Sequence, residues 1–172
     1  TCKADLLSDP INEVRYTYQL ARIYYVFEEY GLAEPLFQTS YNEGYIASSY
    51  YLGAINFHEY SGKFDKSSIK YFTEAYEGGY NEYLSLSYLA DSYYWNNDYL
   101  NAEKYYLIFL KNYHDFDHGE SNFLTDIYSN LADIYYQRDM YIEAEIYFKE
   151  GSLIKYTNYT HTSRYFFDGV YI

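Results

Sequence analysis

The sequence is poor in the features on which disulfide-bonded, membrane-spanning and catalytic proteins depend. It contains one cysteine, Cys2, so no disulfide can form within the chain. It contains no run of 18 or more apolar residues, which excludes a membrane-spanning helix. Gly78-Gly79 lacks the Lys and the Ser or Thr of a phosphate-binding loop, and the sequence has no nucleophile elbow. These absences predict a protein that is not an enzyme and that needs no cofactor.

Basic residues are also scarce. The chain has 12 Lys and Arg against 25 Asp and Glu, a net charge of −13. Nucleic acid phosphates and anionic lipid surfaces repel such a chain, so neither is an expected ligand. A protein partner with a basic surface would be attracted. A second interpretation stays open, in which the charge only keeps an aromatic-rich surface in solution.

Histidines number four, and two of them lie close together in sequence. The segment from His114 to His118 places two His four positions apart with Asp115 and Asp117 between them. On a helix these side chains would suit a divalent metal ion. The segment adjoins Gly119 in a polar connector, so we interpret it as a loop and predict no metal site.

Tyrosine is the residue that the chain has in excess, with 30 among 172 positions, and aromatic residues make up 24% of the sequence. This content excludes a disordered chain. The length suits one domain with a continuous core. Tyrosine serves both at half-buried positions and on binding faces, and we expect packing to account for most of these side chains.

A pattern of small and aromatic residues occurs four times. Each copy begins with a Leu and a tiny residue, and a second small residue and an aromatic follow. The pairs are Leu20-Ala21, Leu52-Gly53, Leu89-Ala90 and Leu131-Ala132, and the residues three positions after the tiny residue are Tyr24, Asn56, Tyr93 and Tyr135. The second small residues are Ala33, Ser68, Ala102 and Ala144. The final aromatics, four positions after these, are Phe37, Phe72, Tyr106 and Phe148. A repeat of this length is typical of stacked helix pairs, which usually form binding surfaces.

The pattern predicts an all-α solenoid of about four helix-turn-helix repeats in a single domain, residues 1–172. The repeats cover about 11–44, 45–79, 80–118 and 119–156, and residues 157–172 form a C-terminal capping helix. The expected helices are 10–30, 32–41, 45–59, 64–77, 81–96, 99–113, 121–137 and 141–155. Gly31 is the expected break in the first pair, Asn96-Asn97-Asp98 is the turn in the third, and Gly78-Gly79 ends the second.

The quoted residues resemble the tetratricopeptide repeat, with copies three and four matching best. Copy two is more similar to the related Sel-one-like repeat, through Leu52-Gly53, Gly62, Asp65, Tyr71-Phe72, Ala75 and Gly78. The resemblance covers about residues 11–155. Asn56 and Ser68 depart from the pattern, and the family's common Pro at the end of each unit is missing. The small positions let two helices cross closely.

The resemblance implies a ligand on the concave face, which the first helix of each pair lines in this family. Carried over by position, the residues of that face are Tyr18, Arg22, Tyr25, Tyr50, Phe57, His58, Asp91, Tyr94, Trp95, Asp133, Tyr136 and Gln137. They include an aromatic row of Tyr25, Phe57, Tyr94 and Tyr136, and a repeated Asp at 91 and 133. Aromatics beside carboxylates suit a partner that presents Arg or Lys. The alternative is that the row packs one helix against the next.

We therefore expect a non-catalytic protein-binding module of bacterial type. The specific hypothesis is an acidic immunity-type inhibitor that neutralises a toxin or effector, because small acidic repeat domains rich in aromatics resemble such proteins. The alternative is an adaptor or scaffold within an assembly, and an enzyme built around Asp91 and His58 ranks last. Self-association is also possible for exposed aromatics. The expected compartment is the cytoplasm, or the periplasm with a membrane anchor if Cys2 is a lipoprotein cysteine.

Overall fold

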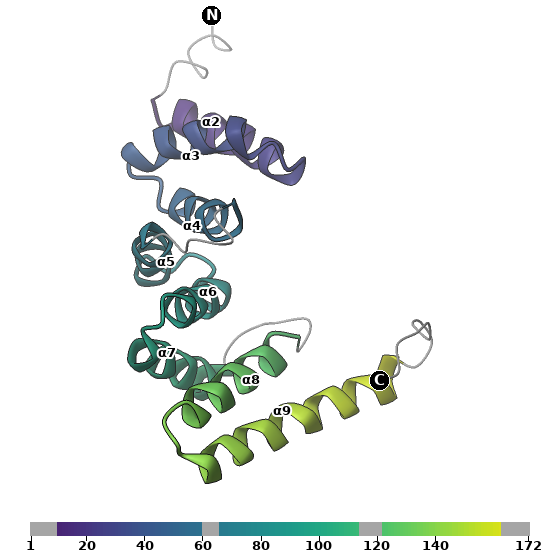
Figure 1. Cartoon of the computed structure of the whole chain (residues 1–172). Helices are drawn as coiled ribbons and strands as arrows, with labels where there is room; N and C mark the ends of the chain where they lie inside the picture. Colours follow the sequence, from purple (N-terminus) through teal and green to yellow (C-terminus); the bar gives the residue numbers. More distant parts are fainter. Residues whose placement is uncertain (1–9, 60–65, 114–121, 163–172) are drawn as a thin grey trace, which may run out of the picture. The chain divides into compact units, whose positions relative to one another are not determined.

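The computed structural model describes residues 10–59, 66–113 and 122–162, and within these ranges every regular element is a helix (Figure 1). The helices are α2 (Pro10–Val26), α3 (Tyr30–Asn42), α4 (Ala47–Glu59), α5 (Ser67–Glu77), α6 (Glu82–Trp95), α7 (Tyr99–Asn112), α8 (Asn122–Tyr136) and α9 (Tyr141–Thr162). The chain divides into two compact units, one ending at Phe109 and one beginning at Leu110. In the described part, no helix is long and apolar enough to cross a membrane.

The turns inside three of the helix pairs share one geometry. Glu28, Asn97 and Asp139 each adopt the left-handed conformation, with φ of 60°, 60° and 59°. The amide one residue later donates to the carbonyl of Tyr24, Tyr93 or Tyr135, at 2.9–3.0 Å. This closure caps the carboxyl end of the preceding helix. In these three pairs the repeated aromatic position therefore also marks where the first helix ends.

The expected break at Gly31 is wrong. α2 ends at Val26 and α3 begins at Tyr30, so Gly31 lies inside α3 and the turn is centred on Glu28. Gly31 has no positive φ, and a Cβ built there meets no atom within 4 Å. Nothing at this position requires a glycine, whereas Glu28 accepts the left-handed conformation that the turn needs. The expected turn at Asn96-Asn97-Asp98 and the end of the second pair at Gly78-Gly79 are confirmed.

The last helix is longer than the sequence predicts. α9 continues past Lys155 to Thr162, so residues 157–162 extend α9 and do not begin a separate capping helix. No Gly or Pro interrupts residues 152–162. Gly151 lies inside α9 and packs closely against Tyr128 of α8, since a Cβ on Gly151 would lie 3.0 Å from the Cβ of Tyr128. The close contact explains why the helix accepts a glycine there. The remainder of the expected cap, residues 163–172, lies outside the described residues.

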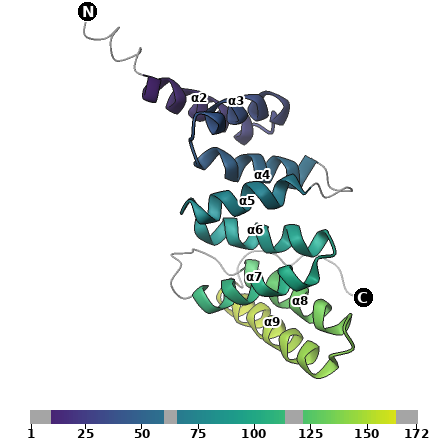
Figure 2. The same cartoon turned by 90° about the vertical axis from the view of Figure 1, so that its left-hand side faces the viewer.

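Consecutive helices pack against one another in the first unit. α2 contacts α3, α3 contacts α4, α4 contacts α5 and α5 contacts α6. Tyr83 of α6 lies 4.8 Å, ring to ring, from Phe109 of α7. α4 also contacts α6, and Figure 1 shows α4 and α6 on one side of this unit with α5 and α7 on the other. Figure 2 shows α4, α5 and α6 one above another in chain order. This arrangement is consistent with helical repeats.

The small residues of the motif lie where the helices of a pair cross. Ala33, Ser68 and Ala102 are buried, and a Cβ on Gly53 would lie 2.9 Å from the ring of Phe72. Asn56, which replaces the usual aromatic, turns its amide back to donate a 2.8 Å hydrogen bond to the carbonyl of Leu52. Its buried polar group is thereby satisfied within its own helix.

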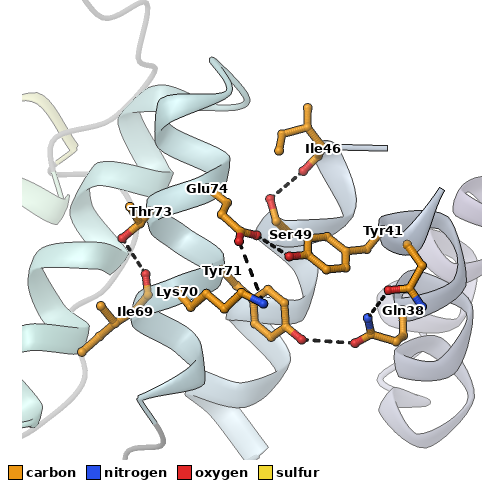
Figure 3. Close-up of polar contacts among 10 residues, drawn as sticks. Gln38, Tyr41, Ile46, Ser49, Ile69, Lys70, Tyr71, Thr73 and Glu74 are labelled. Atoms are coloured by element: carbon orange, nitrogen blue, oxygen red, sulfur yellow. Dashed lines mark hydrogen bonds and ion pairs between the residues drawn. The ribbon is translucent and has the colours of Figure 1, made fainter. Parts of the chain in front are cut away.

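The second helices α3 and α5 are linked by polar contacts near the start of α4 (Figure 3). Tyr41 of α3 donates a 2.7 Å hydrogen bond to Glu74 Oε2 of α5, and Tyr71 of α5 donates a 3.1 Å bond to Gln38 Oε1 of α3. The Lys70 ammonium lies 5.5 Å from the Tyr41 ring centroid and 4.0 Å from Glu74 Oε1. These contacts hold successive helix pairs together across 33 positions of sequence.

The second unit contains the helix pair α8 and α9, which pack along each other. The rings of Tyr135 in α8 and Tyr147 in α9 are stacked, with centroids 5.2 Å apart. The motif residues Leu131 and Ala132 are buried, as their counterparts Leu89 and Ala90 are in α6. Phe148, the last aromatic of the fourth copy, is 65% exposed, whereas Phe37, Phe72 and Tyr106 are fully buried.

Candidate protein-interaction surface

Six tyrosines gather on the first helices of the first unit. This tyrosine cluster contains Tyr18 and Tyr25 of α2, Tyr50 and Tyr51 of α4, Tyr80 of the turn before α6, and Tyr88 of α6. Its closest ring pairs include Tyr25 with Tyr51 at 5.1 Å and Tyr50 with Tyr80 at 5.8 Å. Tyr50 also lies 6.3 Å from Tyr88. The cluster therefore extends over three successive helix pairs.

Its hydroxyl groups are partly paired inside the cluster. The hydroxyls of Tyr18 and Tyr80 lie 3.0 Å apart and share a hydrogen bond, although the residues are 62 positions apart in sequence. Arg22 lies at the edge, with its guanidinium carbon 5.8 Å from the centroid of the Tyr18 ring. Arg22 is exposed and its Nη1 donates to Gln19 Oε1 at 3.4 Å. The edge of the cluster thus carries a cation over an aromatic ring, a favourable contact.

Five phenols of the cluster have raised pKa values and remain protonated at neutral pH. Burial raises the pKa of Tyr25 to about 12, with smaller contributions from the neighbouring phenols. Burial is also the largest cause of the raised pKa values of Tyr18, Tyr50, Tyr80 and Tyr88. A phenol that holds its proton this firmly is a poor nucleophile and a poor general base near neutral pH. It is suited to packing and to hydrogen bonding.

Asp91 is held by its own helix pair. The hydroxyl of Tyr106, a fully buried residue of α7, donates a 2.6 Å hydrogen bond to Asp91 Oδ1. The Asp91 charge also contributes to the raised pKa of Tyr88, after the larger effect of burial. Asp91 therefore interacts both with the tyrosine cluster and with α7, so its carboxylate stabilises the packing of α6 on α7.

The aromatic row predicted from the sequence divides between packing and exposure. Tyr25 lies 5.4 Å from the Tyr30 ring, and Phe57 lies 5.6 Å from Tyr88 in the next first helix. Tyr94 packs edge-on against Trp95 at 5.2 Å, and Trp95 is 50% exposed. In the second unit Tyr136 is exposed and lies 5.4 Å from Tyr141. Packing between helices accounts for the first half of the row.

The remaining predicted residues lie in both units. Tyr18 is buried, and Tyr50 is half-buried within the tyrosine cluster. Asp133 and Tyr136 line a groove of about 520 Å³ between α8 and α9. Gln137 is exposed, and its Nε2 donates to Asp133 Oδ1 at 3.4 Å. His58 belongs to α4, and its side chain lies outside the described part of the structure.

Sequence reasoning missed Tyr51, Tyr80 and Tyr88. A signal for two of them was present, since Tyr51 and Tyr88 each come immediately before the motif Leu of their copy. Tyr80 lies in the turn before α6, at the position that Tyr45 occupies before α4, and it reaches the cluster through the fold. In the described ranges, no group of three or more His, Cys, Asp or Glu is placed to hold a metal ion. The segment from His114 to His118 lies outside those ranges.

Comparison with known proteins adds no family assignment. No protein-family model matches the chain, and a search of curated proteins finds no match. The helix pairs, the tyrosine cluster and the charge of the chain are the features that bear on its function.

Proposed function

We propose that the chain is a tetratricopeptide-like repeat protein that binds a protein partner on the face of its first helices, without catalysis. The observation that carries this proposal is the tyrosine cluster, which makes one aromatic, hydroxyl-bearing surface from α2, α4 and the start of α6. Arg22 and the half-exposed Trp95 belong to the same helices. Tyr, Trp and Arg are the residues that most often dominate the energy of protein interfaces.

The protonation state of the cluster supports binding over chemistry. Burial is the largest cause of the raised pKa values of Tyr18, Tyr25, Tyr50, Tyr80 and Tyr88, so these phenols are not ionised at neutral pH. Asp91, whose charge acts on Tyr88, accepts a hydrogen bond from Tyr106 within the protein. These groups form a packed surface with little ordering cost on association, since a tyrosine has few rotatable bonds to fix.

The charge of the chain supports a basic partner. A net charge of −13 on 172 residues accelerates encounter with a cationic surface and makes the association rate fall with salt. An acidic inhibitor of the immunity type, which neutralises a basic toxin or effector, is the specific function that combines this charge with an aromatic face.

An adaptor or scaffold is the second candidate, and one observation favours it. The predicted binding residues are divided between two compact units, with the tyrosine cluster in the first and the groove lined by Asp133 and Tyr136 in the second. Two separate surfaces suit a protein that holds two partners. An inhibitor needs only one tight contact.

The test uses the purified chain as bait in a lysate of its own organism, washed at low and then at high salt. We expect one stoichiometric basic protein, released by salt, and loss of that protein's activity on addition of the chain. A Trp95→Ala variant should bind that protein about tenfold more weakly or worse. Leu100→Ala is the matched control, because Leu100 is 72% exposed on α7, a second helix.

The outcomes separate the candidates. Several partners held weakly, with no activity blocked, would replace the inhibitor by the adaptor. Equal loss of binding in the Trp95 and Leu100 variants would remove the first-helix face from the proposal. A chain that retains no protein in either wash would contradict both candidates.

A further inference from the structure

α2 carries an exposed apolar ridge on the side away from the tyrosine cluster. The ridge consists of Tyr16, Leu20, Ile23 and Phe27, which are between 44% and 73% exposed. Their spacing of four, three and four residues places them in one row along α2 and the turn that follows it. The row is roughly 16 Å long at 1.5 Å per residue. A continuous apolar row of this kind on the surface marks a contact site.

The same repeat positions are buried in the two following pairs of the first unit. The positions equivalent to Tyr16, Leu20 and Ile23 are Ser48, Leu52 and Ile55 in α4, and Ser85, Leu89 and Ser92 in α6. All six are at most 1% exposed. The cover comes from the second helix of the preceding pair, since α3 packs on α4 and α5 packs on α6. The Ser40 and Ser48 hydroxyls, 2.6 Å apart, lie in the first of these contacts.

The face that provides such cover is partly exposed on α9, where Ala144 is buried and Phe148 is exposed. Inside the first unit, Ala33 and Phe37 of α3 belong to one buried cluster with Leu52 and Ile55 of α4. Their counterparts on α9 are Ala144 and Phe148, and Phe148 is 65% exposed. These two residues line the groove between α8 and α9 with Ala132, Tyr136 and Tyr141. The ridge thus corresponds to the covered faces of α4 and α6, and the groove corresponds to the face of α3 that covers α4.

The charges at the two surfaces are complementary. Arg15 of α2 is exposed beside the ridge, with its guanidinium carbon 5.9 Å from the centroid of the Tyr16 ring. Arg15 Nη2 donates to Asn12 Oδ1 at 3.2 Å, and the acceptor in this hydrogen bond is a neutral amide oxygen. The groove is lined by the carboxylates of Asp133 and Glu145, the second of which pairs with Lys149. Opposite charges at the rim orient an apolar contact.

We propose that the α2 ridge of one copy of this chain docks into the α8–α9 groove of a second copy. The contact between copies repeats the packing of a second helix on the following first helix inside the first unit. It is heterologous, because each copy uses a different surface, so an open row of copies keeps one free ridge and one free groove at its ends. The chain therefore assembles head to tail in a concentration-dependent way. This inference goes beyond the proposed function and uses no partner protein.

The experiment is sedimentation velocity of the full chain over a range of concentrations, with two single variants. Ile23→Asp places a charge on the ridge, and Phe148→Asp places one in the groove. Both side chains are more than half exposed, so neither variant loses core packing. We expect the wild type to sediment as a series of oligomers and each variant to weaken self-association about tenfold or more. Leu100→Asp, an exposed apolar position on α7, should assemble as the wild type does.

Mixing the two variants gives the sharpest result. The Ile23 variant keeps an intact groove and the Phe148 variant keeps an intact ridge, so an equimolar mixture should form a dimer and nothing larger. Tyr136→Asp, exposed in α8, replaces the groove variant if circular dichroism shows that Phe148→Asp has lost helix. A wild type that stays monomeric at high concentration would overturn the proposal. So would a mixture that fails to form dimers, or single variants that assemble as well as the wild type.

Discussion

The Tyr41 hydroxyl donates a 2.7 Å hydrogen bond to the Glu74 carboxylate and so joins α3 to α5 (Figure 3). The bond crosses from one helix pair to the next, and the Lys70 ammonium lies beside both groups. It raises the pKa of Tyr41, because the carboxylate favours the protonated phenol. Contacts of this kind bind repeats to one another in addition to the apolar core.

Removing this bond should weaken the junction between pairs. Tyr41→Phe keeps the ring and deletes the donor, and we expect the free energy of unfolding to fall by about 1 kcal/mol. The Glu74 carboxylate is partly exposed, so the loss in unfolding free energy lies at the lower end of the range for hydrogen bonds to charged acceptors. Urea denaturation followed by circular dichroism measures it. Tyr99→Phe, which loses an exposed 3.2 Å bond to Asn97, is the control and should change stability by less than about 0.5 kcal/mol.

The tyrosine cluster predicts a loss of stability at high pH. The pKa values of Tyr18, Tyr25, Tyr50, Tyr80 and Tyr88 are raised in the folded state, that of Tyr25 from 10.0 to about 12. The folded chain then holds more protons than the unfolded chain above about pH 10, so stability is full below that pH and falls as the pH rises. Denaturation at a series of pH values, with phenolate absorbance recorded in parallel, tests this. Ionisation of every tyrosine near pH 10 with the fold intact would contradict the burial of the cluster.

Two helical glycines should respond to alanine in opposite directions. A Cβ on Gly53 would lie 2.9 Å from the fully buried ring of Phe72, so Gly53→Ala should destabilise the protein by about 1–3 kcal/mol through overpacking. Gly31 lies in α3 with no atom within 4 Å of such a Cβ. Gly31→Ala should therefore stabilise the protein by about 0.5–1 kcal/mol, which is the usual preference of a helix for alanine over glycine. Melting temperatures of the two variants give the signs directly, and equal signs would show that Phe72 does not occupy the crossing.

Asp91 and Tyr106 should be energetically coupled. Tyr106→Phe leaves the Asp91 carboxylate without the 2.6 Å hydrogen bond, and we expect a loss of about 1.5–3 kcal/mol. Asp91→Asn should cost less in a chain that already carries Tyr106→Phe than in the wild type. A double-mutant cycle from urea denaturation measures the coupling, and additive effects would mean that the bond contributes nothing to stability.

The helix pairs could be read from the sequence because their signals are local. Ala33, Ala102 and Gly53 are small where helices cross, and Asn97 and Gly79 lie at turns that need positive φ. Each of these depends on residues within one helix or one turn. The misplaced break at Gly31 shows the limit, because a glycine signals a turn only where the backbone needs its freedom.

The sequence by itself determined that the chain forms pairs of helices, where most of them begin and end, and that its surface is acidic. Only the tertiary structure decided which aromatics pack and which are exposed. The hydroxyls of Tyr18 and Tyr80 share a hydrogen bond although the residues are 62 positions apart. Tyr106 donates a hydrogen bond to Asp91, which the sequence pattern had assigned to partner binding. The physical reason is that helix formation depends on neighbours along the chain, whereas burial and hydrogen bonding depend on how one pair stacks on the next. That stacking exposes Leu20 and Phe148 while it buries the same positions elsewhere.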